Sequence, residues 1–95
     1  MALKTKPFDV AEHLQTAEDI KLFLQVAAEE GSPDDFIHAL NTAARAIGMT
    51  EVAKKAGITR TSLYKSLADG GKPQFATISK VTKALGCQFA VTLPQ

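Results

Sequence analysis

Residues 49–67 read M-T-E-V-A-K-K-A-G-I-T-R-T-S-L-Y-K-S-L, and this spacing predicts two short helices joined by one tight turn. Gly57 stands where the first helix must stop, because glycine adopts a positive φ at little steric cost. Thr59 is the expected N-cap of a second helix over residues 60–68, whose two leucines lie four residues apart and should face inward. Small alanines in the first helix allow the close approach that a steep crossing angle needs. The stretch therefore predicts a helix-turn-helix over residues 49–68.

The second helix of this pair should turn a polar face outward, where it is available to the major groove of DNA. Arg60 would donate two hydrogen bonds to guanine O6 and N7. Thr61 and Tyr64 would touch a thymine methyl group or a phosphate, and Lys65 would pair with a phosphate. The alternative is a solvated polar face on an ordinary helix, and the sequence leaves both interpretations open.

Further candidates for DNA contact flank that helix. Thr50 would offer its hydroxyl and the N-terminus of the first helix to a phosphate, and it would serve equally as a plain N-cap. Lys54, Lys55 and Lys72 are candidates for contacts with the phosphate backbone. Thr59 is included among the candidate DNA-binding residues in addition to its expected role as an N-cap.

The same stretch resembles the helix-turn-helix of phage-repressor-like (Xre/Cro-type) regulators. The shared features are the small Ala53, the turn glycine four residues later, Ile58, and an inward Leu63 six positions past the glycine. One departure is Ser66, which stands where the wider class often has a bulky apolar residue, and here the bulk falls on Leu67. The resemblance implies a small helical DNA-binding domain.

A narrower resemblance extends over residues 8–93. The run A-L-N-T-A-A-R-A-I-G-M-T-E-V-A-K-K-A-G-I-T-R-T-S-L-Y-K-S-L, followed by G-G-K-P-Q-F-A-T-I-S-K-V, is similar to the probable addiction-module antidote family. Members of that family are small DNA-binding proteins, often encoded beside a ribosome-dependent RNase toxin and in some cases carried by prophages. The resemblance implies an antitoxin that represses transcription from its own operator and neutralises a small RNase toxin.

Length and composition narrow the class of protein. A chain of 95 residues predicts one domain, and a hydrophobic content of 45% is ordinary for a globular protein. The single Cys87 excludes an internal disulfide bond and a cysteine-based zinc site. No N-terminal apolar run is long enough for a signal peptide or a membrane span. These features predict a soluble protein of the cytoplasm with no membrane partner.

The net charge of +1 hides a segregation of charge along the chain. Residues 9–35 hold eight acids and one base, which gives −7, and residues 36–95 hold eight bases and two acids, which gives +6. Two lysines near the N-terminus complete the total. Such a dipolar chain should have a basic face on the side of the helix-turn-helix. A protein that binds DNA with one side and keeps the other side off it would have this pattern.

Capping signals place two longer helices before the helix-turn-helix. Thr16 begins the run T-A-E-D, a variant of the capping box, and Gly31 ends the helix that follows. Ser32 and Pro33 give a stronger start signal, because serine caps a helix and proline suits the first helical position. This second helix, ended by Gly48, has a broad apolar face and should be the central core helix.

The chain after the helix-turn-helix predicts one more helix and one strand. Residues 74–85 carry apolar side chains at helical spacing, and residues 87–93 alternate apolar with polar. A lone strand needs a partner, which would be the same strand of a second subunit or an extended piece near residues 8–10. The expected fold is therefore all-α, a five-helix repressor-like helix-turn-helix domain over residues 16–95 with a short C-terminal β-strand, behind an N-terminal tail of residues 1–15.

The sequence argues against catalysis and against bound cofactors. Ser62 has no identifiable histidine and acid partners, and it lacks the glycine pattern of a nucleophile elbow. Asp35 and His38 lie at i, i+3, but no further histidine or cysteine ligands accompany them, so no metal site is expected. Cys87 is expected to be a buried small hydrophobic residue. The protein is predicted to be a non-enzyme that needs no metal and no cofactor.

These observations predict a sequence-specific repressor that binds a palindromic operator in double-stranded DNA as a homodimer. One recognition helix covers only a few base pairs, whereas two helices related by two-fold symmetry read a palindrome about one turn apart. The acidic first half is the expected surface for a small basic toxin. The alternative is a protein-interaction module of the same fold that does not read DNA sequence, which the modest basic content of the second helix, Arg60 and Lys65, favours.

Overall fold

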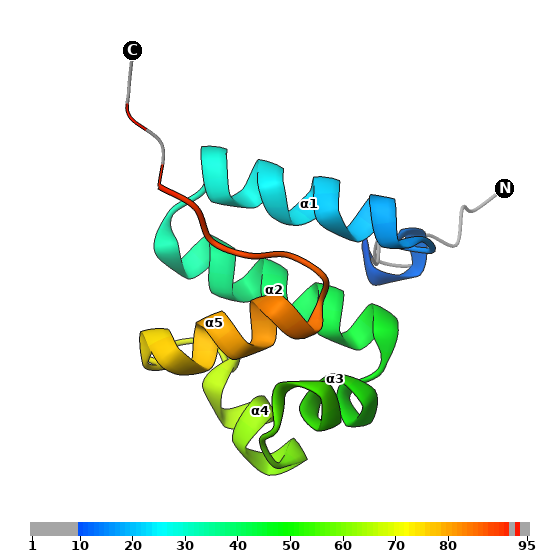
Figure 1. The fold of residues 1–95 in the computed structure, drawn as a ribbon, viewed down its shortest axis with the longest axis vertical. Coiled ribbons are helices and arrows are strands. Elements are labelled where there is room, and N and C mark those ends of the chain that lie inside the picture. The colour runs from blue at the N-terminus through cyan, green and yellow to red at the C-terminus, as the bar shows by residue number, and fades with distance from the viewer. Residues whose placement is uncertain (1–9, 92, 94–95) are drawn as a thin grey trace, which may run out of the picture.

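The computed structural model describes residues 10–91 and 93, and within them the chain folds into five α-helices after one short 3-10 helix (Figure 1). In chain order these elements are η1 (Val10–His13), α1 (Ala17–Glu30), α2 (Pro33–Ile47), α3 (Met49–Ala56), α4 (Arg60–Ser66) and α5 (Phe75–Ala84). The expected helical class and the five expected helices are confirmed. In Figure 1, α1 lies at one end of the molecule and α4 at the other, with α2 between them.

Reciprocal capping boxes begin the two longest helices. The Thr16 hydroxyl accepts a hydrogen bond from the Asp19 N–H at 3.0 Å, and the Asp19 carboxylate accepts one from the Thr16 N–H at 3.1 Å. Ser32 and Asp35 form the same pair of bonds at the start of α2, at 3.1 and 2.9 Å. Each box satisfies backbone N–H groups that the first turn of a helix leaves without partners. Both helices therefore start where the sequence predicted.

Glycines with positive φ form the joints on both sides of α3. Gly48, at φ 122°, ends α2 and begins α3, because its N–H donates to the Ala44 carbonyl at 2.8 Å and its carbonyl accepts from the Val52 N–H at 3.0 Å. Gly57, at φ 74°, ends α3 in the left-handed region, as its position predicted. The chain needs only two further residues before α4 begins.

α4 begins as expected and ends early. Thr59 is its N-cap, and the Thr59 hydroxyl accepts a hydrogen bond from the Ser62 N–H at 3.0 Å. The helix ends at Ser66, two residues before the predicted end at residue 68. The N–H of Leu67 still donates to the Leu63 carbonyl at 3.1 Å, but the Leu67 backbone, at φ −100° and ψ 7°, has left the helical region as the chain turns toward two glycines.

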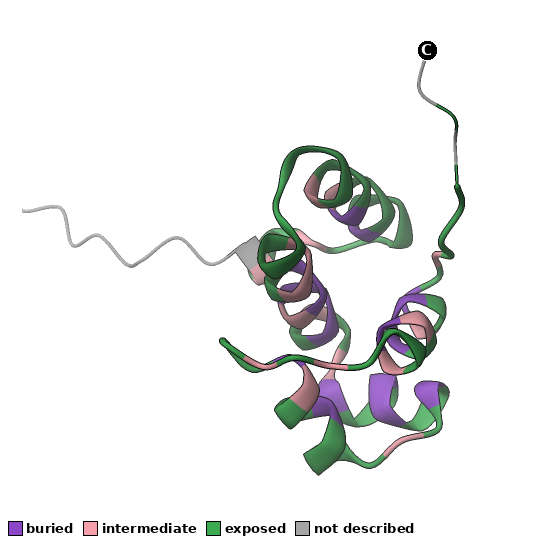
Figure 2. Cartoon of the chain, turned by 90° about the vertical axis from the view of Figure 1, so that its left-hand side faces the viewer, coloured by how far each residue is buried: buried purple, intermediate pink, exposed green. Residues whose placement is uncertain are grey.

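One hydrophobic core fills the space between the helices (Figure 2). Its most completely buried large side chains come from α2, α3, α5 and the region of α4, and they are Leu40, Val52, Leu63, Leu67 and Val81. Two small residues of α3, Ala53 and Ala56, are also buried, and their size lets α3 lie close to its neighbours. The core therefore sets the position of α4 through the inward leucines that the sequence predicted.

The expected C-terminal strand is not seen in the part of the chain that the structure describes. Among the described residues of 87–93, none is in a β-strand. Cys87 is half-buried rather than fully buried, and the Phe89 ring packs with its centroid 5.8 Å from that of Phe36 and 5.3 Å from that of Phe75. The side chains of Cys87 and Phe89 do contact the body, but a strand needs a neighbouring backbone, and the described part of the chain places none beside this segment.

Residues 10–15 pack on the helical body. Val10–His13 form η1, which contacts α2, and Leu14 packs half-buried against the core. The sequence predicted a tail over residues 1–15, and a 3-10 helix of four residues is too short to show the periodicity of a helix. Residues 1–9 lie outside the described residues, so the loose tail expected there stays a prediction.

Candidate nucleic-acid interface

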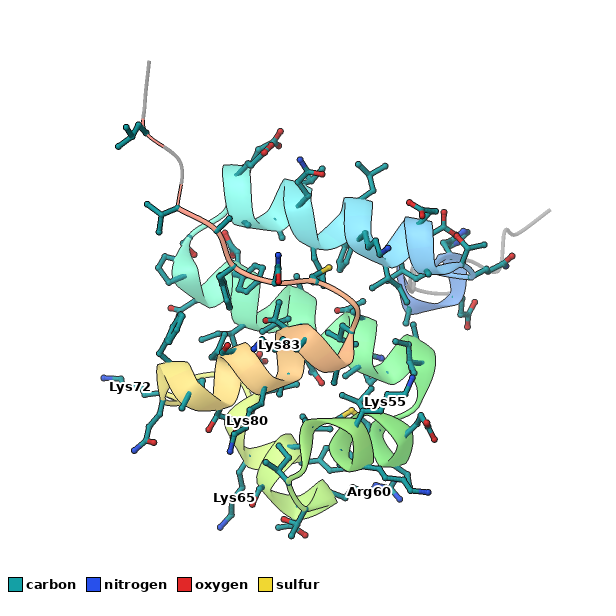
Figure 3. All side chains as sticks on the ribbon, viewed as in Figure 1. Lys55, Arg60, Lys65, Lys72, Lys80 and Lys83 are labelled. Atoms are coloured by element: carbon teal, nitrogen blue, oxygen red, sulfur yellow. The ribbon has the colours of Figure 1, made fainter. Side chains whose placement is uncertain are left out.

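α4 turns one polar face to solvent. Leu63 is fully buried, whereas Arg60, Thr61, Tyr64 and Lys65 are exposed. In Figure 3, Arg60 and Lys65 extend from the α4 end of the molecule, away from the core. The inward and outward sides of this helix are therefore those that the sequence predicted, while DNA contact itself stays a prediction.

The Arg60 side chain lies over Tyr64, one turn further along α4. The guanidinium carbon is 5.4 Å from the centroid of the Tyr64 ring, and Nη2 donates a hydrogen bond to the Tyr64 hydroxyl at 3.2 Å. Within the described part of the chain, no carboxylate forms an ion pair with Arg60. The guanidinium therefore keeps its positive charge uncompensated and most of its five N–H donors free, which suits recognition of a guanine edge or a phosphate.

The Thr59 hydroxyl is committed to the start of α4. It accepts a hydrogen bond from the Ser62 N–H at 3.0 Å and donates one to the Ser62 hydroxyl at 2.9 Å. Thr59 therefore orients the first turn of the helix. Its carbonyl accepts a hydrogen bond from the Leu63 N–H at 3.0 Å, so its methyl group and its backbone N–H are left for any outside contact. The same bonds account for Ser62, whose hydroxyl serves the cap.

Thr50 does not cap α3. The N-cap is Gly48, which makes no side-chain hydrogen bond, and Thr50 lies exposed in the first turn of the helix. The alternative of a plain N-cap at Thr50 is wrong, because the helix already begins at Met49. Thr50 lies at a helix start whose N-cap makes no side-chain hydrogen bond, and such a helix start favours phosphate.

The structure separates the three other lysines that the sequence singled out. Lys54 and Lys55 lie exposed in the last turn of α3, directly before the turn that leads to α4. Lys72 is exposed in the loop that follows α4, and Figure 3 places it beside the start of α5, away from Arg60. Lys54 and Lys55 therefore flank the α3–α4 turn, whereas Lys72 lies at the margin of the candidate interface.

Two exposed lysines on α5 belong to the basic part of the surface although the sequence did not single them out. Lys80 and Lys83 are exposed, while Ile78 and Val81 on the same helix are buried. In Figure 3, Lys80 points toward the end of the molecule that carries Lys65. The sequence alone could have predicted that Lys80 is exposed, because the 3.6-residue period puts it on the side of α5 away from the buried core residues.

Charge is divided between the two ends of the fold. Residues 10–48 contain seven acids and two bases, and residues 49–91 contain seven bases and two acids, which gives −5 and +5. The acids are concentrated on α1 and the first turn of α2, and the bases lie on α3, α4, α5 and the loop before α5. α1 is at the opposite end of the molecule from α4 (Figure 1). The field therefore attracts anions at one end and cations at the other.

Other kinds of site find little support in the described residues. They hold no group of three or more histidine, cysteine, aspartate or glutamate side chains that could bind a metal ion. His38 and Asp69 approach each other at 3.7 Å between Nδ1 and Oδ1, with both side chains largely exposed. None of the described helices has the length and apolar character to cross a bilayer.

Comparison with known proteins gives the family of the chain. The family model for "Probable addiction module antidote protein" matches residues 4–93. An uncharacterized protein of Haemophilus influenzae (strain ATCC 51907 / DSM 11121 / KW20 / Rd) is 46% identical over 91 residues, which cover 96% of this chain and 94% of the relative. No solved structure matches the chain. The protein therefore belongs to the family of probable addiction module antidote proteins.

Proposed function

We propose that the protein is an antitoxin that represses its own operon by binding operator DNA through α4, and that it neutralises a small RNase toxin through another surface. Family membership supports the antidote role. The observation that carries the DNA-binding part is the short α3–turn–α4 pair, whose outer helix offers Arg60 and Lys65 from an exposed face without carboxylate partners among the described residues. Such a protein acts in the cytoplasm and performs no catalysis.

On this proposal, α4 enters the major groove as the recognition helix of a helix-turn-helix. Arg60 reads guanine, and Thr61 and Tyr64 contact a thymine methyl group or a phosphate. The phosphate contacts come from Thr50 and the first turn of α3, from the backbone at Thr59, and from the surrounding lysines, which are Lys54, Lys65 and Lys72. The protein binds as a homodimer, since two α4 helices related by a two-fold axis match a palindromic operator.

The acidic end supplies the proposed surface for the toxin. α1 carries Glu18, Asp19, Glu29 and Glu30, all exposed, and between them lie the exposed apolar side chains Leu22 and Val26. A small RNase that binds RNA is expected to be basic, and complementary charge speeds and orients association. An interaction assay that finds no complex with the product of the neighbouring gene would refute this part of the proposal.

A titration by fluorescence anisotropy tests the DNA-binding part. The protein is titrated against a duplex from its own upstream region and against a scrambled duplex of the same composition, each at two salt concentrations. We expect tight binding that prefers the upstream duplex and weakens steeply with salt, because several phosphate contacts per dimer release counterions. Equal and weak binding to both duplexes would remove the repressor role.

One observation favours a second candidate function. α4 contributes only two bases, Arg60 and Lys65, to its outer face, which is modest for a nucleic-acid surface. A protein-interaction module that kept the fold without reading DNA would have such a helix. The same titration distinguishes the two, since that module would show no preference for the upstream duplex at either salt concentration.

A further inference from the structure

The chain after α5 is an extended segment that runs between α1 and α5 and across α2 (Figure 1), and it lines a hollow together with residues of α1 that include Lys21 and Glu29. We define the C-terminal segment as residues 87–91. Cys87 and Phe89 pack against the body, whereas Gln88 and Ala90 are exposed. The alternation that a strand requires is therefore present, although no strand forms within the described chain.

The apolar side of this segment is covered where it begins and bare where it ends. Phe89 packs between Phe36 and Phe75, and 43% of its surface remains exposed. Val91 is 96% exposed, and Leu93, two residues further, is 88% exposed. Phe75 itself is 68% exposed. One surface of a small protein therefore holds uncovered aromatic and uncovered aliphatic side chains together, which is characteristic of an interface.

The backbone of the C-terminal segment is as unpaired as its side chains. The Cys87 N–H donates to the Thr82 carbonyl at 3.0 Å, and beyond it residues 88–91 take part in no hydrogen bond within the described chain. Extended backbone with free N–H and C=O groups is the usual acceptor of an added strand. A partner that supplies a strand would satisfy these groups and cover the apolar side at once.

Charge identifies the partner that fits this surface. Residues 84–93 contain no charged side chain, so a segment that pairs with a copy of itself brings no like charges together. The end of the molecule at α1 is acidic and the end at α4 is basic, and each suits a partner of opposite charge. In an antiparallel pair, the end of one strand lies beside the beginning of the other, so Val91 and Leu93 of one copy would lie next to Phe89 of its partner, close to the exposed Phe75 ring.

We propose that two copies of the chain associate through an antiparallel ribbon formed by their C-terminal segments, with Phe36, Phe75 and Phe89 of each copy beneath it. The association stands on the exposed side chains and the unpaired backbone, while its role in operator recognition rests on the proposed function. In the ribbon, the segment with alternating apolar and polar residues gains a neighbouring strand, which the described part of a single copy does not provide. It also provides a two-fold axis far from the charged outer face of α4.

The mass of the protein in solution tests the proposal through one variant and one matched control. Sedimentation equilibrium of the full chain, over a low to high micromolar series, should give twice the chain mass of 10.1 kDa. Val91→Asp should shift the protein to the mass of one chain, because each carboxylate would be buried against the Phe89 ring of the partner copy. The dimer dissociation constant should rise at least about tenfold, which corresponds to about 1.4 kcal/mol. Leu22→Asp makes the same chemical change on α1, where the side chain is 63% exposed, and it should leave the dimer intact.

Amide hydrogen exchange then tests the ribbon itself. In the dimer, alternate N–H groups of the C-terminal segment should be protected, and this protection should be lost in Val91→Asp. Circular dichroism checks that the variant keeps its helices, as expected for a side chain that is 96% exposed. A monomeric wild-type protein, a Val91→Asp protein that dimerises like the wild type, or a dimer without protection in this segment would each overturn the proposal. Neither DNA nor toxin is present, so these results do not depend on whether the protein binds an operator.

Discussion

The hydrogen bond and ring contact between Arg60 and Tyr64 decide what α4 offers to a partner. The Arg60 guanidinium lies along the helix surface, where it contacts both the ring and the hydroxyl of Tyr64. An ordered donor loses less conformational entropy when it binds than a freely rotating one. Selectivity of α4 should therefore depend on this pair of residues more than on its remaining side chains.

Arg60→Ala should remove discrimination at one base position of each operator half-site. We expect a loss of roughly 1 to 3 kcal/mol at that position, because the bidentate contact with guanine disappears. Anisotropy titrations against duplexes substituted at each position in turn would measure it. Lys54→Ala is the control, since loss of a phosphate contact should weaken all duplexes alike. An Arg60→Ala protein with unchanged selectivity would disprove the assigned reading face.

Tyr64→Phe removes the hydroxyl that accepts the Arg60 hydrogen bond and keeps the ring beneath the guanidinium. We expect it to weaken operator binding less than Arg60→Ala does, because the ring contact remains. Its effect should shrink in the Arg60→Ala background, since the part that the hydroxyl exerts through Arg60 is then already lost. A double-mutant cycle measures this coupling directly. Additive effects would mean that the hydrogen bond between Arg60 and Tyr64 contributes nothing to operator binding.

Helical periodicity was enough to predict which residues of α4 face outward, but contacts between side chains were harder to foresee. Arg60 and Tyr64 stand at i, i+4, a spacing that brings side chains together, and their mutual contact adds to the separate DNA contacts that the sequence predicts for each. Thr50 was given a possible capping role that Gly48 fills, because a helix start depends on backbone angles as well as residue type. Lys80 was not predicted, because its approach to the α4 end of the molecule depends on how α5 packs on α3.

At the scale of elements, the joint between α3 and α4 depends on one backbone conformation. Gly57 lies at φ 74°, and a Cβ atom built there would meet nothing within 4 Å. Gly57→Ala should therefore destabilise the fold only through backbone strain, by about 1 to 2 kcal/mol. Gly57→Asn should cost less, because asparagine tolerates the left-handed region. Urea unfolding of the three proteins measures the order, and equal stabilities would contradict the structural role of this glycine.

The capping box of α1 predicts a dependence of stability on pH. Backbone N–H groups of Gln15 and Thr16 donate to the Asp19 carboxylate and lower its pKa below the ordinary value of 3.8. A lowered folded-state pKa means that this stabilisation is present above pH 3.8 and is lost as the pH falls through the folded-state pKa. Asp19→Asn should lower the Tm at neutral pH, and the difference from the wild type should shrink in acid.

Thermal unfolding of the two proteins across a pH series measures this dependence. Glu18→Gln is the matched control, because Glu18 lies in the same first turn and outside the capping box. It separates the loss of the cap from the loss of a negative charge near the helix N-terminus. A difference between Asp19→Asn and the wild type that stays constant with pH would contradict the proposed cause.

The elements that sequence predicted best are those whose signals are local. Thr16 and Ser32 start helices because their side chains bond to backbone groups three residues away, so the nearby sequence contains the whole cause. A strand at residues 87–93 depends on a partner backbone instead, and no pattern within the segment can supply one. The end of α4 was misplaced for a similar reason, because a fraying last turn is decided by the loop that follows it.

At the scale of the whole molecule, the separation of charge predicts that the two proposed surfaces act independently. Glu29→Lys combined with Glu30→Lys reverses charge at the C-terminal end of α1, away from the α4 end of the fold. We expect slower association with the toxin at low salt and unchanged operator affinity, because steering acts over about one Debye length. Stopped-flow mixing with the product of the neighbouring gene measures the rate. A parallel loss of operator affinity would show that the ends are coupled.

Gly48 places a limit on how this chain can vary in length. This one residue ends α2 and begins α3, because its N–H donates a hydrogen bond to the Ala44 carbonyl and its carbonyl accepts one from the Val52 N–H. A residue inserted or deleted there would rotate everything that follows by about 100° around the axis of α3, since successive helical residues turn by that angle. The connection between α4 and α5 spans residues 67–74 and could absorb the same change in its turns. Natural insertions among relatives should therefore gather in that connection, and the junction between α2 and α3 should keep a constant length.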